Sequence, residues 1–428
     1  SSDLGKFERV VNLGCNPVYD GGADIDSKAI VDKTEFRLIN FAQDESHSDS
    51  GINAPLAHYL ESWGDARTSN GTIVSVQPLI APLFDAMSEL EVLAVFADPE
   101  DPQSAHTVVK DTFSGNDAAW QHYLHQGYQE GSALDPIPVE ELELSQELPD
   151  IPYRQVPEGS LEVVFTRDYS VDDGRFANNG WCQEVPDPIN KITWDNVMSI
   201  SRKTASERKI NNGEMVRLEL GDYEVEAPVW IQPGLADNTV ALPLGYGRTG
   251  KLRIANFKYE KRPLINNEFF GAEDVPVGGF NAYKVRTSGE SNITTGIKLM
   301  SLGRTYPLSS TQEHWSMEGR PIVREATLEE FRKSEKKRAE ELDKEGYSEK
   351  HFFPDNMGLG SHARNEGKIY QHPYKERPSL KSDMHQWGMS IDLNTCNGCN
   401  ACVIACQSEN NIPIVGKAQV AKGREMHW

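Results

Sequence analysis

The residues with the clearest chemical signature are cysteines near the end of the sequence. Of the six cysteines in 428 residues, four have the spacing C-x2-C-x2-C-x3-C, namely Cys396, Cys399, Cys402 and Cys406. Gaps of two residues let consecutive thiolates converge on one centre, while backbone amides hydrogen-bond the sulfides of an iron–sulfur cluster. The small residues Gly398, Asn400 and Ala401 favour a loop that folds tightly around such a centre. The pattern predicts a [4Fe–4S] site.

Two other kinds of site also use clustered cysteines. Structural zinc sites usually combine two C-x2-C pairs across a longer insert. Disulfides between such near neighbours would be strained. Both stay open as alternatives, but the spacing favours iron and sulfide.

The fourth cysteine has a further implication. In ferredoxin-type pairs this cysteine ligates the neighbouring cluster, so Cys406 would need ligands from elsewhere. Cys15 and Cys182 are isolated in the sequence and are more typical of packing residues, although a disulfide between them stays open. We therefore expect the completing ligands beyond Trp428 or on another chain, and interpret the sequence as part of a longer protein.

The remaining candidates for chemistry are weaker. His122 and His125 share a possible helix, but no third metal ligand follows at a suitable spacing. The glycine loop "GYGRTG" at 245–250 lacks the features of a nucleotide-binding motif. No Ser-His-Asp arrangement stands out, so we assign no catalytic residue.

The composition limits the functional classes. The net charge of −22, from 65 acidic and 43 basic residues, argues against binding to nucleic acid. A hydrophobic content of 38% is that of a globular protein. No apolar run is long enough to cross a membrane, so any membrane attachment must come from partners.

The first part of the sequence, residues 1–130, predicts alternating strands and helices. Apolar runs that read as strands occur at 9–20, 35–42 and 90–102. Candidate helices lie between or after them, at 80–90 and 117–129. This alternation is typical of a parallel, doubly wound sheet.

The rest of the sequence divides into segments that differ in composition and residue pattern. We predict a linker at 131–160, a β-barrel at 161–305, a charged helix with an extended linker at 306–385, and the first part of a ferredoxin-like domain at 386–428. The barrel follows from short, alternating, β-branched runs separated by turns. Residues 324–346 supply the charged helix, which we expect to be exposed.

The order of these modules resembles the molybdopterin oxidoreductase family. "VVNLGCNPVYD" is similar to its strand and Gly-x-Asn-Pro loop, and "HYLESWGDARTSNGTIVSVQPLIAPL" to its segment near the cofactor, where Glu61, Gly71 and Gln77 match. The sequence from "NNGEMVRLEL" to "ALPLGYG" follows the strand order of its dinucleotide-binding barrel. The resemblance implies a double-psi-type β-barrel beside part of a doubly wound α/β domain.

The same resemblance implies candidate pterin-site residues, here vestigial. They are Asn16, Gly247 and Asn281, the last in the "GGFNAY" loop. Two departures from active molybdenum enzymes favour loss of the cofactor. "AYK" follows Asn281 where Leu-Thr is common, and "LGYGRTG" stands in place of the more usual His-Gly-Trp-Gly.

The fusion of such a module to a ferredoxin-like one points to a smaller group of proteins. "HQWGMSIDLNTCNGCNACVIACQSENNIPIVGK", "WGDAR", "PDPINKITWDN" and "GREMHW" resemble the B subunit of bacterial alternative complex III, a quinol-oxidising respiratory complex. The resemblance implies an exported, periplasmic chain with [4Fe–4S] clusters, a [3Fe–4S] cluster elsewhere in the full protein, and no molybdopterin. It also implies partners, a multi-haem cytochrome c subunit and an integral-membrane quinol-binding subunit.

Two functions follow as expectations. The favoured one is an electron conduit and scaffold that carries electrons from quinol toward haem acceptors, without substrate chemistry of its own. The alternative is a catalytic molybdenum bis-pterin oxidoreductase of the polysulfide reductase type with a fused iron–sulfur domain. Metal content separates them.

Overall fold

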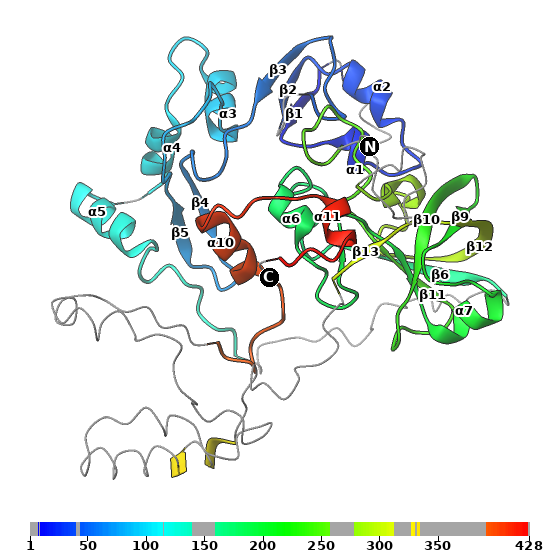
Figure 1. The fold of residues 1–428 in the computed structure, drawn as a ribbon. Helices are drawn as coiled ribbons and strands as arrows, with labels where there is room; N and C mark the ends of the chain where they lie inside the picture. Colours follow the sequence, from blue (N-terminus) through cyan, green and yellow to red (C-terminus); the bar gives the residue numbers. More distant parts are fainter. Residues whose placement is uncertain are drawn as a thin grey trace. The chain divides into compact units, whose positions relative to one another are not determined.

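The computed structural model describes residues 7, 9–39, 43–113, 115–138, 159–256, 278–311, 327–329, 332–333 and 391–426. The chain forms two units (Figure 1). One contains residues 1–311 together with 399–428, and the other contains residues 312–398. The fold described below belongs to the first unit. Most of the charged helix expected at 324–346, and residues 139–158 of the expected linker, lie outside the described residues.

The chain begins with a small parallel sheet. Its strands β1 (Val11–Leu13), β2 (Phe36–Ile39) and β3 (Ile52–Pro55) are paired in sequence order. Two short helices connect β1 to β2, α1 (Pro17–Asp20) and α2 (Ser27–Asp32). The Asp26 side chain caps α2 by accepting a hydrogen bond from Ala29 N. The strands predicted at 9–20 and 35–42 are therefore confirmed.

The next region differs from the doubly wound prediction. β4 (Gly64–Arg67) and β5 (Ile73–Val76) form an antiparallel hairpin. It is followed by the helices α3 (Glu89–Ala97), α4 (Ala105–Thr112) and α5 (Asp117–Gln126). A small core of Val109, Trp120 and Tyr123 lies among these elements. The helix predicted at 117–129 is confirmed.

Two sequence predictions in this region are wrong. The run at 90–102 forms helix α3 rather than a strand, because Ser88 and Glu91 make a capping box at its start. Residues 80–88 contain no helix, since Pro82 within the run disfavours one. The described strands of this region also do not form a doubly wound sheet.

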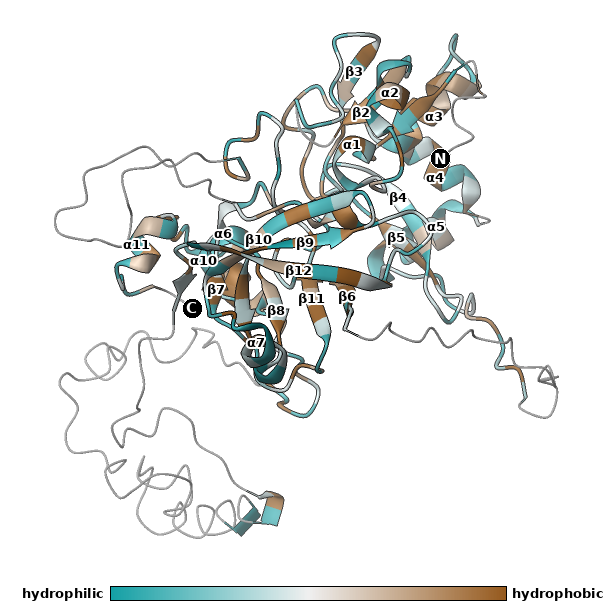
Figure 2. Ribbon diagram, turned by 90° about the vertical axis from the view of Figure 1, so that its right-hand side faces the viewer, coloured by the Kyte–Doolittle hydropathy of each residue, from teal (hydrophilic) through white to brown (hydrophobic). Residues whose placement is uncertain are grey.

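A closed barrel of six strands forms the main core, in the order β10-β8-β11-β6-β12-β9. The strands are β6 (Leu161–Thr166), β8 (Met198–Ile200), β9 (Glu214–Leu220), β10 (Tyr223–Ile231), β11 (Thr239–Pro243) and β12 (Ile293–Thr305). Helix α7 (Arg202–Arg208) and the 3-10 helix η3 (Ala282–Val285) complete the region. Alternating residues of the strands, such as Leu161, Val163 and Phe165, point into the apolar core, and apolar segments recur along these strands (Figure 2). The predicted mixture of α/β structure and an all-β barrel is confirmed.

Short elements join the barrel to the C-terminal residues. They are α6 (Gly180–Glu184), β7 (Ile192–Thr193), β13 (Ser309–Ser310), α10 (Ala401–Glu409) and α11 (Lys417–Ala421). β13 pairs with β7, α10 lies against α6, and α11 lies against β13. No helix among the described residues is long and apolar enough to span a membrane.

Candidate metal centre

The first predicted cysteine ligand follows a turn. Cys396 N and Thr395 N both donate to the carbonyl of Asp392, and the Asp392 carboxylate accepts from Asn394 N at 2.9 Å. An Asp that bonds backbone amides two residues on stabilises a local turn. The sequence therefore fixes the loop around Cys396 by short-range contacts.

The loop continues with two residues in the left-handed region. Gly398 has φ +74° and Asn400 has φ +59°, conformations that Gly and Asn adopt at low cost. This agrees with the tight loop expected from the small residues of the motif. Helix α10 then carries Cys402 and Cys406, which are four residues apart and so share one helix face.

The cysteines of the motif are exposed, and none is in a disulfide bond. The side-chain amide of Asn410 donates to Cys406 O at 2.8 Å and lies 3.6 Å from Cys406 Sγ. An amide donor to sulfur is a usual feature of thiolate ligands. Among the described residues, no three His, Cys, Asp or Glu side chains are gathered as a metal-ligand set. The four-cysteine site therefore stays a prediction from spacing.

The helix that carries two of the cysteines is held at both ends by the region around α6. Before the helix, the Asn400 amide donates to Pro186 O at 3.2 Å. After it, the Trp181 indole donates to Ile412 O at 2.8 Å. Gly180 allows this close contact, because a Cβ at that position would lie 2.4 Å from Ile414 Cδ1.

A buried carboxylate from α6 binds the backbone that follows. Glu184 Oε2 accepts hydrogen bonds from Gly416 N at 2.8 Å, Val415 N at 3.1 Å and Trp194 Nε1 at 3.2 Å. Burial raises the pKa of the Glu184 carboxyl, and the two backbone N–H donors act against that rise. Three donors on one carboxylate make this a specific contact.

A second buried carboxylate binds the next side chain. Lys417 Nζ lies 2.6 Å from Asp195 Oδ2, with exposed side-chain fractions of 1% and 0%. Tyr306 completes the group, since its hydroxyl donates to Asp195 Oδ1 at 2.9 Å and accepts from Lys417 Nζ at 3.0 Å. Burial lowers the pKa of Lys417, and the charge of Asp195 opposes this. Asp195 and Lys417 lie in two segments that carry the family resemblance, but sequence reasoning did not select these residues, because their pairing depends on the tertiary structure.

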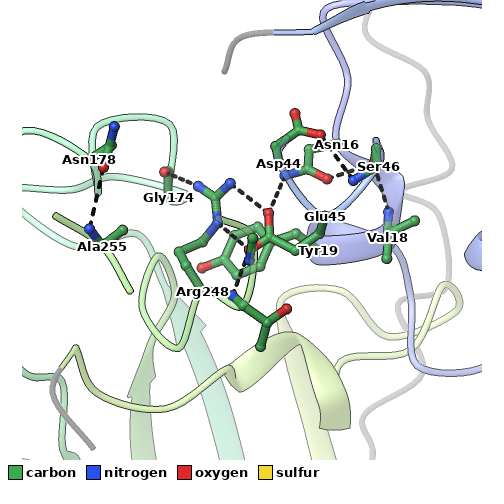
Figure 3. A network of polar contacts seen from close by, with 12 residues as sticks. Asn16, Val18, Tyr19, Asp44, Glu45, Ser46, Gly174, Asn178, Arg248 and Ala255 are labelled. Atoms are coloured by element: carbon green, nitrogen blue, oxygen red, sulfur yellow. Dashed lines mark hydrogen bonds and ion pairs between the residues drawn. The ribbon is translucent and has the colours of Figure 1, made fainter. Parts of the chain in front are cut away.

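The candidate Asn16 belongs to one network of polar contacts with Arg248, the residue after the candidate Gly247 (Figure 3). Asn16 is engaged at both ends of its side chain, because its amide donates to Glu45 at 2.9 Å and its oxygen accepts from Ser46 Oγ at 2.6 Å. Glu45 in turn forms an ion pair with Arg248. Arg248 also donates to Gly174 O at 2.7 Å.

Gly247 and Asn281 lie directly against each other. A Cβ on Gly247, which has φ +69°, would lie 2.1 Å from Asn281 N. The Asn281 side chain accepts from Tyr283 N at 2.9 Å and donates to Tyr19 O at 3.5 Å. The polar groups of Asn16 and Asn281 are thus used inside the chain, which does not fit a role in holding a pterin. The absence of molybdopterin stays a prediction.

The other residues matched to the cofactor segment also have contacts within the chain. Glu61 accepts from His58 N and Leu83 N, and Gln77 donates to Leu124 O at 2.8 Å. Gly71 has φ +88°, and a Cβ there would meet Leu134. These contacts are all with residues 58–134, and none of them is with Asn16.

The isolated cysteines are free thiols, and Cys182 belongs to α6, the helix against which α10 lies. Cys15 is exposed and Cys182 is partly buried, and neither is in a disulfide. Cys182 packs against a small apolar cluster, as expected for a packing residue. His122 lies on α5 as predicted, with Nε2 3.5 Å from Glu130.

Comparisons with known proteins give one local sequence match. A stretch of 34 residues is 59% identical to the iron–sulfur cluster-binding subunit of menaquinone reductase from Nitratidesulfovibrio vulgaris. It covers 8% of this chain and 13% of that protein. The chain is locally similar to an iron–sulfur protein. No family model matches the sequence.

Among solved structures, the chain is similar to acetylene hydratase from Pelobacter acetylenicus. The TM-score is 0.38 at 14% identity, over 56% of this chain and 37% of the hydratase. A likeness at this level carries no argument about function.

Proposed function

We propose that this chain is an iron–sulfur electron-transfer subunit. The observation that carries the proposal is the C-x2-C-x2-C-x3-C spacing of residues 396–406. The local similarity to a cluster-binding subunit also supports it. The left-handed residues Gly398 and Asn400 add a loop geometry suited to closely spaced ligands.

The chemistry asked of the chain is limited to holding and tuning redox centres. Cys396, Cys399 and Cys402 would hold one [4Fe–4S] cluster, and Cys406 would contribute to an adjacent one. Such clusters supply one-electron transfer without bonds made to a substrate. The protein sets their reduction potentials through hydrogen bonds to sulfur and through burial, and Asn410 offers a donor of this kind.

The finer part of the proposal concerns the complex. We propose a quinol-oxidising complex of the alternative complex III type, with an integral-membrane quinol-binding subunit and a multi-haem cytochrome c subunit as partners. The chain would be peripheral, on the periplasmic face of the inner membrane. The family resemblance of several segments supports this, and the similar subunit belongs to a protein named menaquinone reductase. The acidic balance of the chain suits docking to basic partners.

The test is the metal content of the intact purified complex, together with EPR spectra of its reduced and oxidised states. We expect iron beyond that of the haems, cluster signals on reduction, and no molybdenum. Absence of cluster iron would overturn the proposal. Stoichiometric molybdenum would instead favour the catalytic bis-pterin alternative and make residues 1–305 part of an active site.

A further inference from the structure

The segment after the cysteine motif is held by buried polar contacts from distant parts of the chain. Glu184 binds its backbone, and Asp195 binds the Lys417 side chain. We propose that Glu184 of α6 and Asp195, in the loop between β7 and β8, form a receptor that recognises Lys417 and its neighbouring backbone, and thereby positions the cysteine-bearing helix α10. The inference rests on the proposed iron–sulfur function only for the role given to that helix. Nothing in the cysteine spacing requires such a receptor.

The first argument is the cost of burying charge. A lysine ammonium loses its hydration when it is fully buried, and it is tolerated only with a well-placed counter-charge and further hydrogen-bond partners. Asp195 and Tyr306 supply these to Lys417. An apolar contact could slide along the barrel, whereas this buried pair fixes a single register of the segment.

The second argument is that the contacts bracket the helix. The Asn400 contact with Pro186 precedes α10, and the Trp181 contact with Ile412 follows it. The Glu184 carboxylate then binds two consecutive backbone amides immediately before Lys417. With both flanks held, Cys402 and Cys406 take a fixed place beside α6. Glu184, Asp195 and Lys417 are therefore positioning residues, and α6 with the loop between β7 and β8 supports the electron-transfer segment.

The test uses the full-length protein in its complex and follows backbone hydrogen exchange by mass spectrometry. In Lys417→Met, exchange in residues 410–421 should rise about tenfold or more, because Asp195 is left buried without its counter-charge. Exchange in strands β9 and β10 should stay unchanged. Lys422→Met is the matched control, since this exposed lysine of the same segment should have no effect.

A double variant separates recognition from general stability. Asp195→Leu with Lys417→Met removes both charges, so exchange in residues 410–421 should return toward the wild-type rate. Equal exchange in Lys417→Met and Lys422→Met would overturn the inference. So would a rise throughout the barrel that the double variant does not reverse.

A spectroscopic readout tests positioning directly. Lys417→Met should retain the iron content of the wild type but alter the EPR line shape of the cluster signals, because the orientation and surroundings of α10 become less defined. Unaltered spectra in a variant with released residues 410–421 would contradict the positioning role. A wild-type protein without cluster iron would refute the proposed function alone, since the exchange results do not depend on iron.

Discussion

Arg248 Nη2 lies 2.7 Å from Glu45 Oε2, and both side chains are only 3% exposed. The two residues are 203 positions apart in the sequence. A second bond joins Arg248 Nε to Glu45 Oε1 at 3.0 Å, and the guanidinium lies 4.3 Å from the centre of the Tyr19 ring. This bidentate pair connects the N-terminal α/β region to the barrel. Arg248 lies in the loop at 245–250, in which only the glycines stand out in the sequence.

Breaking this pair should destabilise the fold strongly. Arg248→Met leaves the Glu45 carboxylate buried without its counter-charge, and we expect a loss of about 3–5 kcal/mol in the free energy of unfolding. Urea denaturation measures the loss. The double variant Glu45→Leu with Arg248→Met should lose clearly less than the sum of the single variants. Additive losses would mean that the pair is not coupled in solution.

The pH dependence of the same pair has a definite sign. Burial acts to raise the pKa of Glu45, but hydrogen bonds and charge from Arg248 outweigh it and lower the pKa from 4.5 to about 2. Because the folded-state pKa is depressed, its stabilising contribution is present above pH 4.5 and is lost as the pH falls toward 2. Glu45→Gln should lack this acid-dependent loss in unfolding experiments between those values.

Asp44 should behave in the opposite way. Burial, with a smaller contribution from the Glu45 charge, raises the pKa of this carboxyl from 3.8 to about 6. The folded state therefore holds the proton more tightly, and stability falls as the pH rises from 3.8 to about 6. Asp44→Asn should be more stable than the wild type by about 1–2 kcal/mol at pH 8, with no gain at pH 3. The exposed Asp49→Asn is the control, and an equal gain there would contradict the assignment.

Asn410 should tune the cluster to which Cys406 contributes. Asn410→Asp replaces the amide donor 3.6 Å from Cys406 Sγ by a carboxylate. We expect the reduction potential to fall by tens of millivolts. The variant loses the N–H donor to sulfur, whose positive end stabilises the reduced cluster. Asn411→Asp adds the same charge one residue away and serves as the control in redox titrations followed by EPR. Equal shifts in both variants would assign the effect to charge alone.

The thiols should divide into ligands and non-ligands. Cys399→Ser or Cys402→Ser should lower the cluster iron per protein, whereas Cys182→Ser should keep it. Burial raises the pKa of Cys182 to about 11, so this thiol stays protonated at neutral pH and is a poor ligand. Iron analysis and the visible absorption of the purified variants measure the difference. Loss of iron in Cys182→Ser, with the fold retained, would refute this division.

The sequence by itself predicted the features that depend on local patterns, namely the barrel strands and the cysteine site. Alternating apolar residues indicated the strands of the barrel, since side chains of a strand point to opposite faces. The cysteine spacing indicated a metal site because it depends on ligands within one loop. The run at 90–102 misled, since a short apolar run fits a helix or a strand, and the Ser88–Glu91 capping box favours the helix.

Only the tertiary structure decided which charged residues meet. The chain has 65 acidic and 43 basic residues, so no single acid or base stands out by type or local spacing. Lys417 meets Asp195, and Arg248 meets Glu45, because the fold brings together loops that are more than 200 residues apart in the sequence. Because these two pairs are buried, removal of one partner should cost far more stability than in an exposed pair. A charge without water needs a specific partner.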